Sequence, residues 1–589
     1  MSKKPMTFKE YKKLNLSQIS DEILSYWEDN DIFRKSIEKS NDKNPFVFFE
    51  GPPSANGLPG IHHVLARSIK DIFLRYKTMK GYSVQRKAGW DTHGLPVELG
   101  VENTLGITKE DIGKKITIED YNNECKKAVM KYTDIWNDLT KKMGYWVDVD
   151  NPYITYTPKY MESVWWLLKE IYNKDLMYKG YTIQPYSPKA GTAISSHELN
   201  QPGTYQDVTD TTVTAQFKLK KEELPKFLNS DDDIFVLAWT TTPWTLPSNT
   251  ALTVGPKINY SLIKSFNQYT GLRADYIVAE DLISKQFLGN YYETSDLDEI
   301  NKYEFDSKQI PFLKISTFKG KDLENIQYDQ LLDYAKPFDN PENAFRIITG
   351  DFVTTSDGTG IVHTAPTFGA DDAFVAKNAK PPIPPMLVKD EFGDLVPLVD
   401  LQGKFRPEMD EFSGKFVKNE YYDSKSIPEK SVDVEIAIKL KIENKAFRVE
   451  KYKHSYPNCW RTDKPILYYP IDSWFISASK YRNKMVLLNK KINWKPKSTG
   501  EGRFEKWLEN VNDWNLSRSR FWGIPLPIWI SEDGKEKKCI GSIEELIFEI
   551  NHSVDKGFMK SNLFRYMVRI SSFVYCLSSL TAIVHSLNF

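Results

Sequence analysis

Short apolar runs and one long amphipathic segment alternate between residues 45 and 90. The run 45–49, PFVFF, is short, apolar and aromatic, and it predicts a fully buried strand. From 63 to 80 apolar residues recur at three- and four-residue steps, which predicts an amphipathic helix that Gly81 ends. A second strand is predicted over 82–88. Strand, helix and strand in this order predict a parallel crossover unit, which binds ligands at the carboxyl ends of its strands.

The pattern changes twice along the rest of the chain. Short helices are predicted over 20–27 and 32–37, and helices rich in Trp and Lys over 115–180. From 200 to 445, Thr and Val runs alternate with turns and long polar loops, which predicts a β-rich domain inserted into the crossover fold. From 446 to 560 helical and aromatic segments return.

Composition narrows the class of protein. At about 150 residues per domain, 589 residues allow about four domains. Lys+Arg and Asp+Glu both total 79, so the formal net charge is zero and any binding of a polyanion depends on local patches. Four cysteines form no disulfide framework, which is typical of a reducing compartment. The last acidic residue is Asp555; the apolar stretch 571–589 is rich in Ser, and we expect no membrane span there.

The first candidate site is Gly51–Val64, GPPSANGLPGIHHV. A Gly/Pro-rich loop lets backbone approach a ligand closely, and two histidines at a helix N-terminus are suited to a triphosphate. The alternative is a glycine loop that only reverses the chain. Because no GxxxxGK[ST] loop and no GxGxxG after a strand occurs, neither a P-loop nor a standard dinucleotide site is indicated.

The second candidate site is Gly89–Glu98, GWDTHGLPVE. Asp91 is expected at the end of the second strand, beside the first loop. A carboxylate there can hold an ammonium group by a charge-assisted hydrogen bond. The alternative is a helix cap.

These two segments resemble the class I aminoacyl-tRNA synthetases, and GWDTHGLPVE resembles the isoleucyl members in particular. NCWRTDKPILYY (458–469), DSWF (472–475) and SRSRFWGIPLPIW (517–529) extend the resemblance over about 15–560. It implies an α/β fold in which a Rossmann-like parallel sheet, incomplete here, is interrupted by a β-rich editing domain. Without the later strands, apolar faces of the remaining strands and helices are expected to stay uncovered.

The resemblance also implies domain boundaries. The expected segments are an N-terminal helical extension over 1–44, the first half of the catalytic domain over 45–199, the inserted editing domain over 200–445, a partial return to the catalytic domain over 446–561, and an apolar tail off the family pattern over 562–589.

By this resemblance the chain takes part in protein biosynthesis, activating isoleucine with ATP and Mg²⁺ as substrate and esterifying the acceptor end of tRNA(Ile). In the family's HIGH tetrad, Gly60 replaces the first His, His62 replaces the Gly, and His63 keeps the last position. The ligand-binding positions that the resemblance transfers are Gly60, His62 and His63 for ATP, and Gly51, Pro52, Pro53 and Asp91 for the amino acid. The family resemblance further implies a cytoplasmic monomer.

Two segments of the predicted inserted domain form the third candidate site. They read WTTTPWTLPSN (239–249) and GTGIVHTAPTFGADD (358–372). A Thr run alone fits ordinary β-propensity. The resemblance implies instead an editing pocket for Val-tRNA(Ile), which Thr240, Thr241, Thr242 and His363 line while Asp372 binds the ammonium group. Such a pocket is needed because one methylene gives only about 1–3 kcal/mol of discrimination; isoleucine against valine is the standard example.

Zinc is not expected. Many relatives carry two CxxC pairs that bind a structural zinc ion. The matching segments here, 187–190 (SPKA) and 459–462 (CWRT), keep one of the four cysteines.

Several family segments are not found. DVWFDSG, EGxDQxRGW and the KMSKS loop do not follow GIPLPIW; the Met559-Lys560-Ser561 echo lies in the wrong context, and no helical anticodon-binding region occurs. The chain leaves the family pattern near residue 562, which suggests a truncated or frameshifted product. Three hypotheses follow: a ligase, a chain that keeps only the editing deacylase, or an inactive or RNA-binding fragment.

Overall fold

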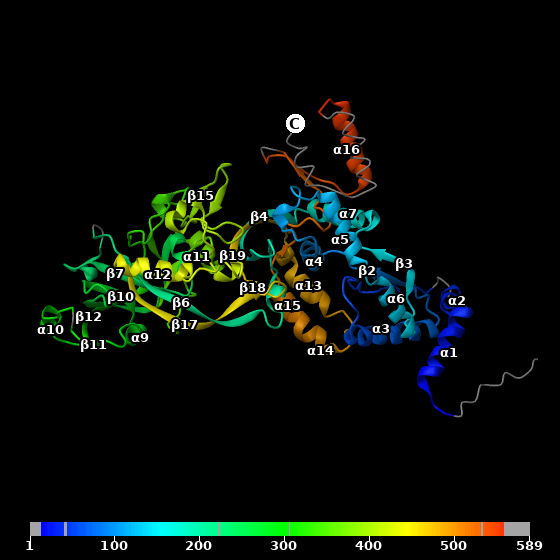
Figure 1. The fold of residues 1–589 in the computed structure, drawn as a ribbon, viewed down its shortest axis with the longest axis horizontal. Helices are drawn as coiled ribbons and strands as arrows, with labels where there is room; N and C mark the ends of the chain where they lie inside the picture. Colours follow the sequence, from blue (N-terminus) through cyan, green and yellow to red (C-terminus); the bar gives the residue numbers. More distant parts are fainter. Residues whose placement is uncertain (1–12, 40–43, 222–223, 306, 532–533, 559–589) are drawn as a thin grey trace, which may run out of the picture. The chain divides into compact units, whose positions relative to one another are not determined.

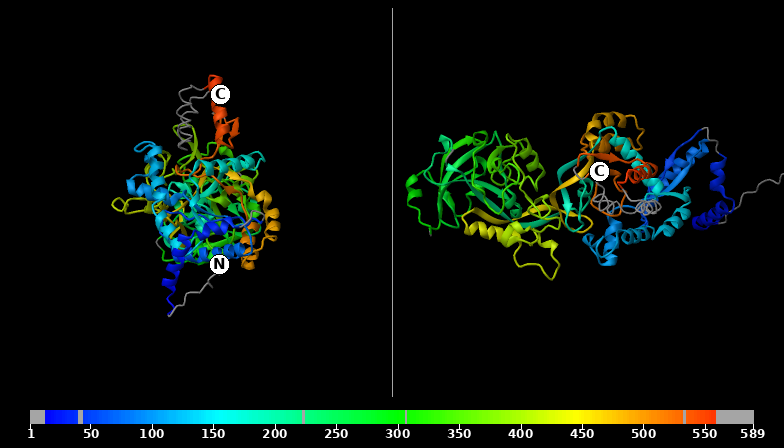
Figure 2. Two further views of the ribbon diagram at one scale, coloured as in Figure 1. Left: turned by 90° about the vertical axis from the view of Figure 1, so that its right-hand side faces the viewer. Right: turned by 90° about the horizontal axis from the view of Figure 1, so that it is seen from above.

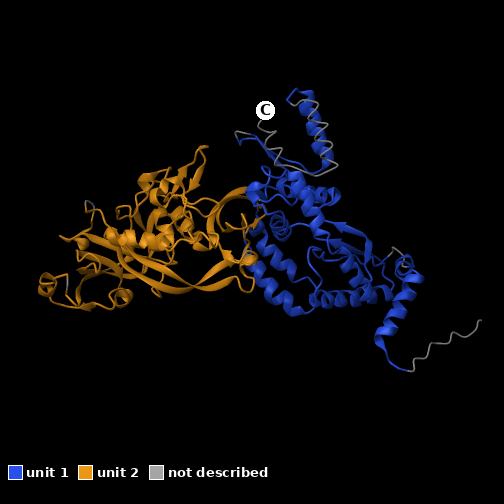
Figure 3. Cartoon of the chain, viewed as in Figure 1, with its two compact units in different colours: residues 1–178, 476–512, 520–589 blue, residues 179–475, 513–519 orange. Residues whose placement is uncertain are grey.

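The computed structural model describes residues 13–39, 44–221, 224–305, 307–531 and 534–558. The chain divides into two compact units, shown in Figure 3. Unit 1 comprises 1–178, 476–512 and 520–589, and unit 2 comprises 179–475 and 513–519. Unit 2 is longer at both ends than the predicted insertion, whose boundaries at 200 and 445 stay a prediction.

Unit 1 combines helices with a small sheet (Figure 1). Its helices are α1 (Leu16–Asp29), α2 (Ile32–Glu38), α3 (Ile61–Met79), α4 (Leu95–Leu105), α5 (Ile118–Val129), α6 (Thr133–Lys142), α7 (Pro158–Tyr172), α13 (Arg482–Asn489), α14 (Lys497–Thr499), α15 (Glu505–Glu509) and α16 (Ile543–Asp555). Its strands are β1 (Phe48–Phe49), β2 (Arg86–Trp90), β3 (Asp148–Ile154), β21 (Ile528–Ile530) and β22 (Lys537–Cys539).

The parallel crossover unit is confirmed. Strands β1, β2 and β3 form a three-stranded parallel sheet in which Phe48 pairs with Arg86 and Trp90 with Ile154. Helix α3 connects β1 to β2 and matches the predicted helix within two residues at its start and one at its end. The sequence analysis did not predict β3. Its residues, DVDNPYI, are mostly polar, and the strand forms because it pairs with β2.

The prediction of a fully buried strand at 45–49 is wrong. Only Phe48 and Phe49 are in strand conformation, and Val47 and Phe49 are 73% and 63% exposed. The cause is the position of β1 at the sheet edge, because β2 is its only strand neighbour in the described ranges.

Helix α3 buries a different face from the one its apolar residues predict. Arg67 and Leu74 are buried, whereas Leu65 and Ile72 are 64% and 67% exposed, and Ile69, Phe73 and Tyr76 are exposed as well. An exposed apolar stripe on α3 is what the incomplete-sheet prediction implies.

The motif SRSRFWG contacts α4 through a buried ion pair in unit 1. Arg520 Nε lies 2.7 Å from Glu98 Oε2, and another guanidinium nitrogen binds Glu102. Glu98 Oε1 accepts the backbone N–H groups of Phe521 and Trp522 at 3.1 and 2.9 Å. The Trp522 ring then packs in the core around Val97, Val101 and Tyr121, so one carboxylate fixes a segment more than 400 residues away in sequence.

Unit 2 is built on one large sheet, with smaller β elements beside it (Figures 1 and 2). Its strands are β4 (Met177–Ser187), β5 (Thr192–Ala193), β6 (Tyr205–Lys218), β7 (Ile234–Thr240), β8 (Ala251–Val254), β9 (Asn259–Phe266), β10 (Arg273–Ala279), β11 (Tyr291–Glu293), β12 (Ile310–Lys319), β13 (Arg346–Thr349), β14 (Ile361–Thr364), β15 (Leu387–Lys389), β16 (Leu395–Pro397), β17 (Ala446–Cys459), β18 (Lys464–Pro465), β19 (Leu467–Ile476) and β20 (Trp514–Asn515). Its helices are α8 (Ser196–Leu199), α9 (Ile283–Gln286), α10 (Leu297–Asn301), α11 (Ala370–Asn378) and α12 (Val432–Ile442).

The large sheet of unit 2 has the strand order β11-β12-β9-β10-β7-β14-β8-β13, and β6 joins β7 to β17. The β-rich prediction is therefore confirmed. The predicted return of helical segments at 446 is wrong for its first part: β17 pairs antiparallel with β6 from Ala446 to Pro457, and β19 follows. Pairing with a distant strand overrides the local pattern there.

The tail 562–589 and Met559–Ser561 lie outside the described residues. Within the described ranges, no helix combines the length and apolar character that a membrane crossing needs.

Replacing Arg520 tests how much the buried ion pair stabilises unit 1. Arg520→Ala leaves two buried carboxylates without their cation, and we expect the free energy of unfolding to fall by about 3–5 kcal/mol. Thermal and denaturant unfolding measure the change. The control is Lys127→Ala, which removes an exposed pair with Glu124 and should cost about 0–1 kcal/mol. If both changes lower the free energy of unfolding equally, the buried ion pair of Arg520 does not stabilise unit 1 more than an exposed pair does.

Candidate functional site

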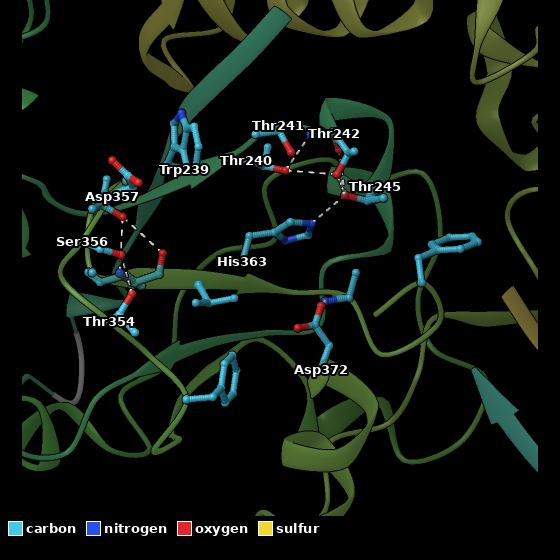
Figure 4. A pocket seen from close by; sticks show the side chains of 18 residues that line it. Trp239, Thr240, Thr241, Thr242, Thr245, Thr354, Ser356, Asp357, His363 and Asp372 are labelled. Atoms are coloured by element: carbon cyan, nitrogen blue, oxygen red, sulfur yellow. Dashed lines mark hydrogen bonds between the residues drawn. The ribbon is translucent and has the colours of Figure 1, made fainter. Parts of the chain in front are cut away.

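A cavity of about 410 Å³ opens in unit 2, at the ends of β7 and β14 and beside the first turn of α11 (Figure 4). The five residues predicted for this site all line it: Thr240, Thr241, Thr242, His363 and Asp372. The structure adds lining residues that the sequence prediction did not assign: Trp239, Thr245, Phe352, Thr354, Ser356, Asp357, Gly358, Thr359, Gly360, Ile361, Val362, Ala365 and Phe368. Hydroxyl and carboxylate groups thus surround one space.

The wall carrying the threonines is held from behind by a buried carboxylate. After β7 the chain enters the 3₁₀ turn η4 (Pro243–Ser248), and Asp433 at the start of α12 accepts the Trp244 N–H at 2.9 Å. Burial raises the pKa of Asp433 to about 6, although the positive charge of Lys418, whose Nζ lies 3.8 Å away, acts to lower it. Helix α12 also packs on β6 and η4, so it holds η4 by packing as well as by this hydrogen bond.

The threonine side chains form a short ladder of hydroxyl groups. Thr240 Oγ1 accepts the Thr242 N–H at 3.1 Å and lies 3.3 Å from Thr242 Oγ1. Thr245 Oγ1 donates to the Thr242 carbonyl at 2.8 Å. The backbone thus fixes the three hydroxyls beside one another, with Thr240 and Thr245 buried.

His363 contacts this ladder from the neighbouring strand. Strand β14 pairs parallel with β7 at Val362 and antiparallel with β8, which directs His363 toward η4. Its Nε2 lies 3.1 Å from Thr245 Oγ1, as Figure 4 shows, and its Nδ1 lies 2.9 Å from Asn249 Nδ2. Burial lowers the pKa of His363 to about 4, so the imidazole is neutral near pH 7.

Asp372 supplies the carboxylate of the cavity. It lies in the first turn of α11, and its Oδ2 accepts the Ala365 N–H at 2.9 Å. Burial raises the pKa of Asp372 to about 6, and the neighbouring charge of Asp371 acts in the same direction. Such a carboxylate is ionised at pH 7, and a cationic ligand group would lower its free energy further.

Two glycines shape the opposite wall. Gly358 and Gly360 both have φ near +71°, and a Cβ on Gly360 would lie 2.4 Å from the Cβ of Ala279. The backbone conformation here therefore favours glycine at both ends of the GTG motif, and the close approach of Ala279 leaves no room for a side chain at Gly360. Thr354 and Ser356 precede it, 3.0 Å apart between hydroxyl oxygens; the polar run VTTSD before GTG is the signal that could have identified them.

A second candidate site lies in unit 1, where the predicted amino-acid residues come together. The Asp91 N–H, one residue past β2, donates to the Pro53 carbonyl at 3.0 Å. This bond places the Asp91 backbone against the loop of Gly51, Pro52 and Pro53. Asp91 is exposed, so its carboxylate is accessible to a cation.

The segment 60–63 (GIHH), which matches the HIGH tetrad, forms the N-terminus of α3. Gly60 is the N-cap, and its N–H donates to His63 Nδ1 at 2.9 Å, which leaves Nε2 as the donor of the neutral ring. Burial, followed by the charges of His62 and Arg67, lowers the pKa of His63. His62 is exposed, and its ring centre lies 3.8 Å from that of His63.

A buried carboxylate anchors this helix to the sheet. Glu50, directly after β1, binds Lys70 Nζ at 2.8 Å, lies 3.9 Å from Arg67 Nε and accepts the Tyr145 hydroxyl. Two partners on α3 and one in the loop before β3 thus hold the N-terminal half of α3 against the end of β1.

The segments that match the zinc knuckle lie in two turns. Ser187 Oγ accepts the Ala190 N–H at 3.2 Å, and Cys459 is buried among Ile194, Leu199 and Ile466. No group of three or more His, Cys, Asp or Glu in the described ranges is arranged to hold a metal ion. The absence of zinc stays a prediction.

Residues 22–567 match the family of tRNA synthetases class I (I, L, M and V), and the chain belongs to this family. The chain is 56% identical over 581 residues to an isoleucine–tRNA ligase of Bacteroides fragilis, and 58% identical over 557 residues to one of Cytophaga hutchinsonii. These alignments cover 96% and 93% of this chain but 50% and 49% of the relatives. The chain therefore spans about half the length of the curated relatives it matches.

Among solved structures, a ternary complex of LeuRS, tRNA and LeuAMS from Agrobacterium radiobacter matches with a TM-score of 0.30 at 16% identity. The match covers 88% of this chain and 51% of that one.

Substitution of Gly360 tests the shape of the cavity wall. Gly360→Ala combines a left-handed backbone, which costs about 1–2 kcal/mol for a residue with a Cβ, with overpacking against Ala279, which costs about 1–3 kcal/mol more. Denaturant unfolding measures the loss. Gly414→Ala is the matched control, because Gly414 has φ +75° and open space around its Cβ position. If the two variants are equally stable, the close approach to Ala279 does not shape the wall.

Proposed function

We propose that unit 2 hydrolyses the ester bond of a misacylated tRNA. The observation that carries this proposal is the single cavity of about 410 Å³ that Thr240, Thr241, Thr242, His363 and Asp372 line together. A carboxylate suits the ammonium group of an aminoacyl ester, and a set of hydroxyls suits its carbonyl and the attacking water. No other cavity is needed for these roles.

The proposed reaction balances without a cofactor. The oxygen of water attacks the ester carbonyl carbon, the bond from that carbon to the ribose oxygen breaks, and a proton from the water passes to the ribose oxygen. The products are a free amino acid and the restored tRNA hydroxyl. Asp372 binds the ammonium group, and the hydroxyls of Thr240 and Thr242 orient the carbonyl and the water.

The relatives support the identity of the substrate. Because they are isoleucine–tRNA ligases, we propose tRNA(Ile) as the acceptor and valine, which is smaller than isoleucine by one methylene, as the amino acid removed. A substrate made for translation implies a cytoplasmic protein, and the proposal takes the chain as a monomer.

We propose a second role for unit 1, part of the site that activates isoleucine with ATP and Mg²⁺. The N-terminus of α3 offers the positive end of a helix, and His62 and His63 add side chains that can donate to phosphate oxygens. Asp91 beside the loop of Gly51, Pro52 and Pro53 suits the ammonium group of the amino acid. Mg²⁺ would arrive on the ATP phosphates.

Two assays on the full chain separate the roles. Release of valine from Val-tRNA(Ile) reports the hydrolase, and isoleucine-dependent exchange of pyrophosphate into ATP reports the synthetic half-reaction. Hydrolysis without exchange would show a deacylase, exchange would show that the chain activates isoleucine, and neither would leave an inactive or RNA-binding fragment.

Substitution of Asp372 tests the carboxylate. Asp372→Asn keeps the shape and the acceptor for Ala365 N–H but removes the charge, so we expect kcat/KM for Val-tRNA(Ile) hydrolysis to fall about 10- to 100-fold, as for loss of a charged hydrogen bond. Asp371→Asn, a change of the same size at the exposed neighbour, is the control. Equal rates for both variants would remove Asp372 from the mechanism.

The pKa of Asp372 predicts the pH dependence. Below a pKa of about 6 the carboxyl is neutral and loses its attraction for ammonium, so kcat/KM should rise with pH up to about 6 and level off above it. The measurement is the hydrolysis rate from pH 5 to 8 for wild type and Asp372→Asn. The variant should lose the step at about 6; a step of the same size in both proteins would assign it to another group.

A further inference from the structure

A chain of hydrogen bonds runs from a buried tyrosine outside the cavity to the threonine ladder. The Tyr328 hydroxyl donates to Asn249 Oδ1 at 2.6 Å. Asn249 Nδ2 then lies 2.9 Å from His363 Nδ1, and His363 Nε2 lies 3.1 Å from Thr245 Oγ1. Tyr328 does not line the cavity and is fully buried between Phe217 and Phe345.

Backbone carbonyls at both ends of this chain fix the direction of every bond. Asn249 Nδ2 also lies 2.8 Å from the Ala251 carbonyl, which only accepts, so this atom is the amide NH₂ and it donates to His363 Nδ1. At the other end, the Thr245 hydroxyl donates to the Thr242 carbonyl at 2.8 Å, so Thr245 Oγ1 accepts from His363 Nε2. His363 Nδ1 is therefore unprotonated, and Nε2 carries the proton.

We infer that Tyr328 is a positioning residue of this site: through Asn249 it holds His363 as the neutral Nε2–H tautomer, which orients Thr245 and Thr242 instead of accepting a proton from water. The inference rests on the proposed hydrolytic function and refines it. A ring whose Nδ1 accepts and whose Nε2 donates has no free lone pair for a general base. Protonation of Nδ1 would set two donors 2.9 Å apart, which accords with the lowered pKa of His363.

The tautomer is measured directly on the full chain. Two-bond ¹H–¹⁵N spectra of protein labelled at histidine distinguish the Nδ1–H ring, the Nε2–H ring and the imidazolium, and His363→Gln assigns the signal among the eight histidines. We expect the Nε2–H ring at pH 7. Asn249→Asp places an acceptor against Nδ1 and should move the proton there or charge the ring. A wild-type spectrum with a proton on Nδ1 would overturn the inference.

Hydrolysis of Val-tRNA(Ile) tests the positioning role. Tyr328→Phe should lower kcat about 2- to 10-fold, as for loss of one neutral hydrogen bond, with KM unchanged. Tyr276→Phe is the control, because Tyr276 is equally buried in the same unit and its hydroxyl has no hydrogen-bond partner among the residues that the structure describes; this change should leave the rate unaltered. Equal rates for the two variants would overturn the role of Tyr328.

His363→Gln separates orientation from base catalysis. A glutamine amide also offers one acceptor and one donor group but cannot act as a base, so we expect the loss of kcat to stay below 100-fold. A general base contributes about 10²–10⁴-fold, and a loss in that range would overturn the inference. If the wild-type chain hydrolyses no Val-tRNA(Ile), the proposed function fails, whereas the ring spectrum still decides the tautomer.

Discussion

The antiparallel pairing of β6 with β17 is the constraint on which the chain's organisation depends. It joins Tyr205 to Pro457, so a segment of about 250 residues leaves and returns at one place. Closing a loop of this length is entropically costly, and a long ladder of backbone hydrogen bonds offsets that cost. Once the ends of the insertion meet, residues on both sides of it can fold as one unit. Arg520 and Glu98, which lie on the two sides of this segment in sequence, form a buried ion pair in unit 1.

Hydrogen bonds to the backbone also fix individual side chains around the cavity of unit 2. The cavity wall is polar, and buried groups in it and behind it are linked to backbone atoms: Thr245 in the wall to a carbonyl, and behind it Asn249 to a carbonyl and Asp433 to an N–H. Such networks hold side chains in one arrangement, because any rotation leaves a buried group unpaired. Asp372 differs, since a ligand cation would complete its charge pairing. The contrast between Asp433 and Asp372 separates a carboxylate that holds the fold from one that we propose to bind an ammonium group.

Local pattern was sufficient for α3 and for the parallel crossover, because both depend on neighbours in sequence. The five residues that meet in the cavity were predicted from the resemblance of two motifs to a known family. Local pattern was insufficient for β3 and β17, whose strand conformation depends on partners far away in sequence. It also missed Tyr328, since a tyrosine among apolar residues carries no signal until Asn249 is placed beside it. The face that α3 buries was misjudged for a related reason: Glu50 and Thr140 bind Arg67 on the buried side, while Leu65, Ile69 and Ile72 stay exposed.

The two units therefore support the two proposed roles unequally. In unit 2 the hydrogen-bond network behind the cavity closes on its own backbone, and the strands beside the cavity have partners on both sides. In unit 1 the predicted ATP-binding residues lie at the start of a helix whose apolar stripe is exposed, next to an edge strand of a three-stranded parallel sheet. Parallel sheets are normally covered on both faces, and a site that needs atoms fixed within a fraction of an ångström is sensitive to motion of the elements that carry it. The proposed hydrolysis needs only the cavity and the hydrogen-bond network of unit 2, whereas the proposed activation needs precise placement of a partly uncovered helix and an edge strand. The described residues therefore support hydrolysis more fully than activation.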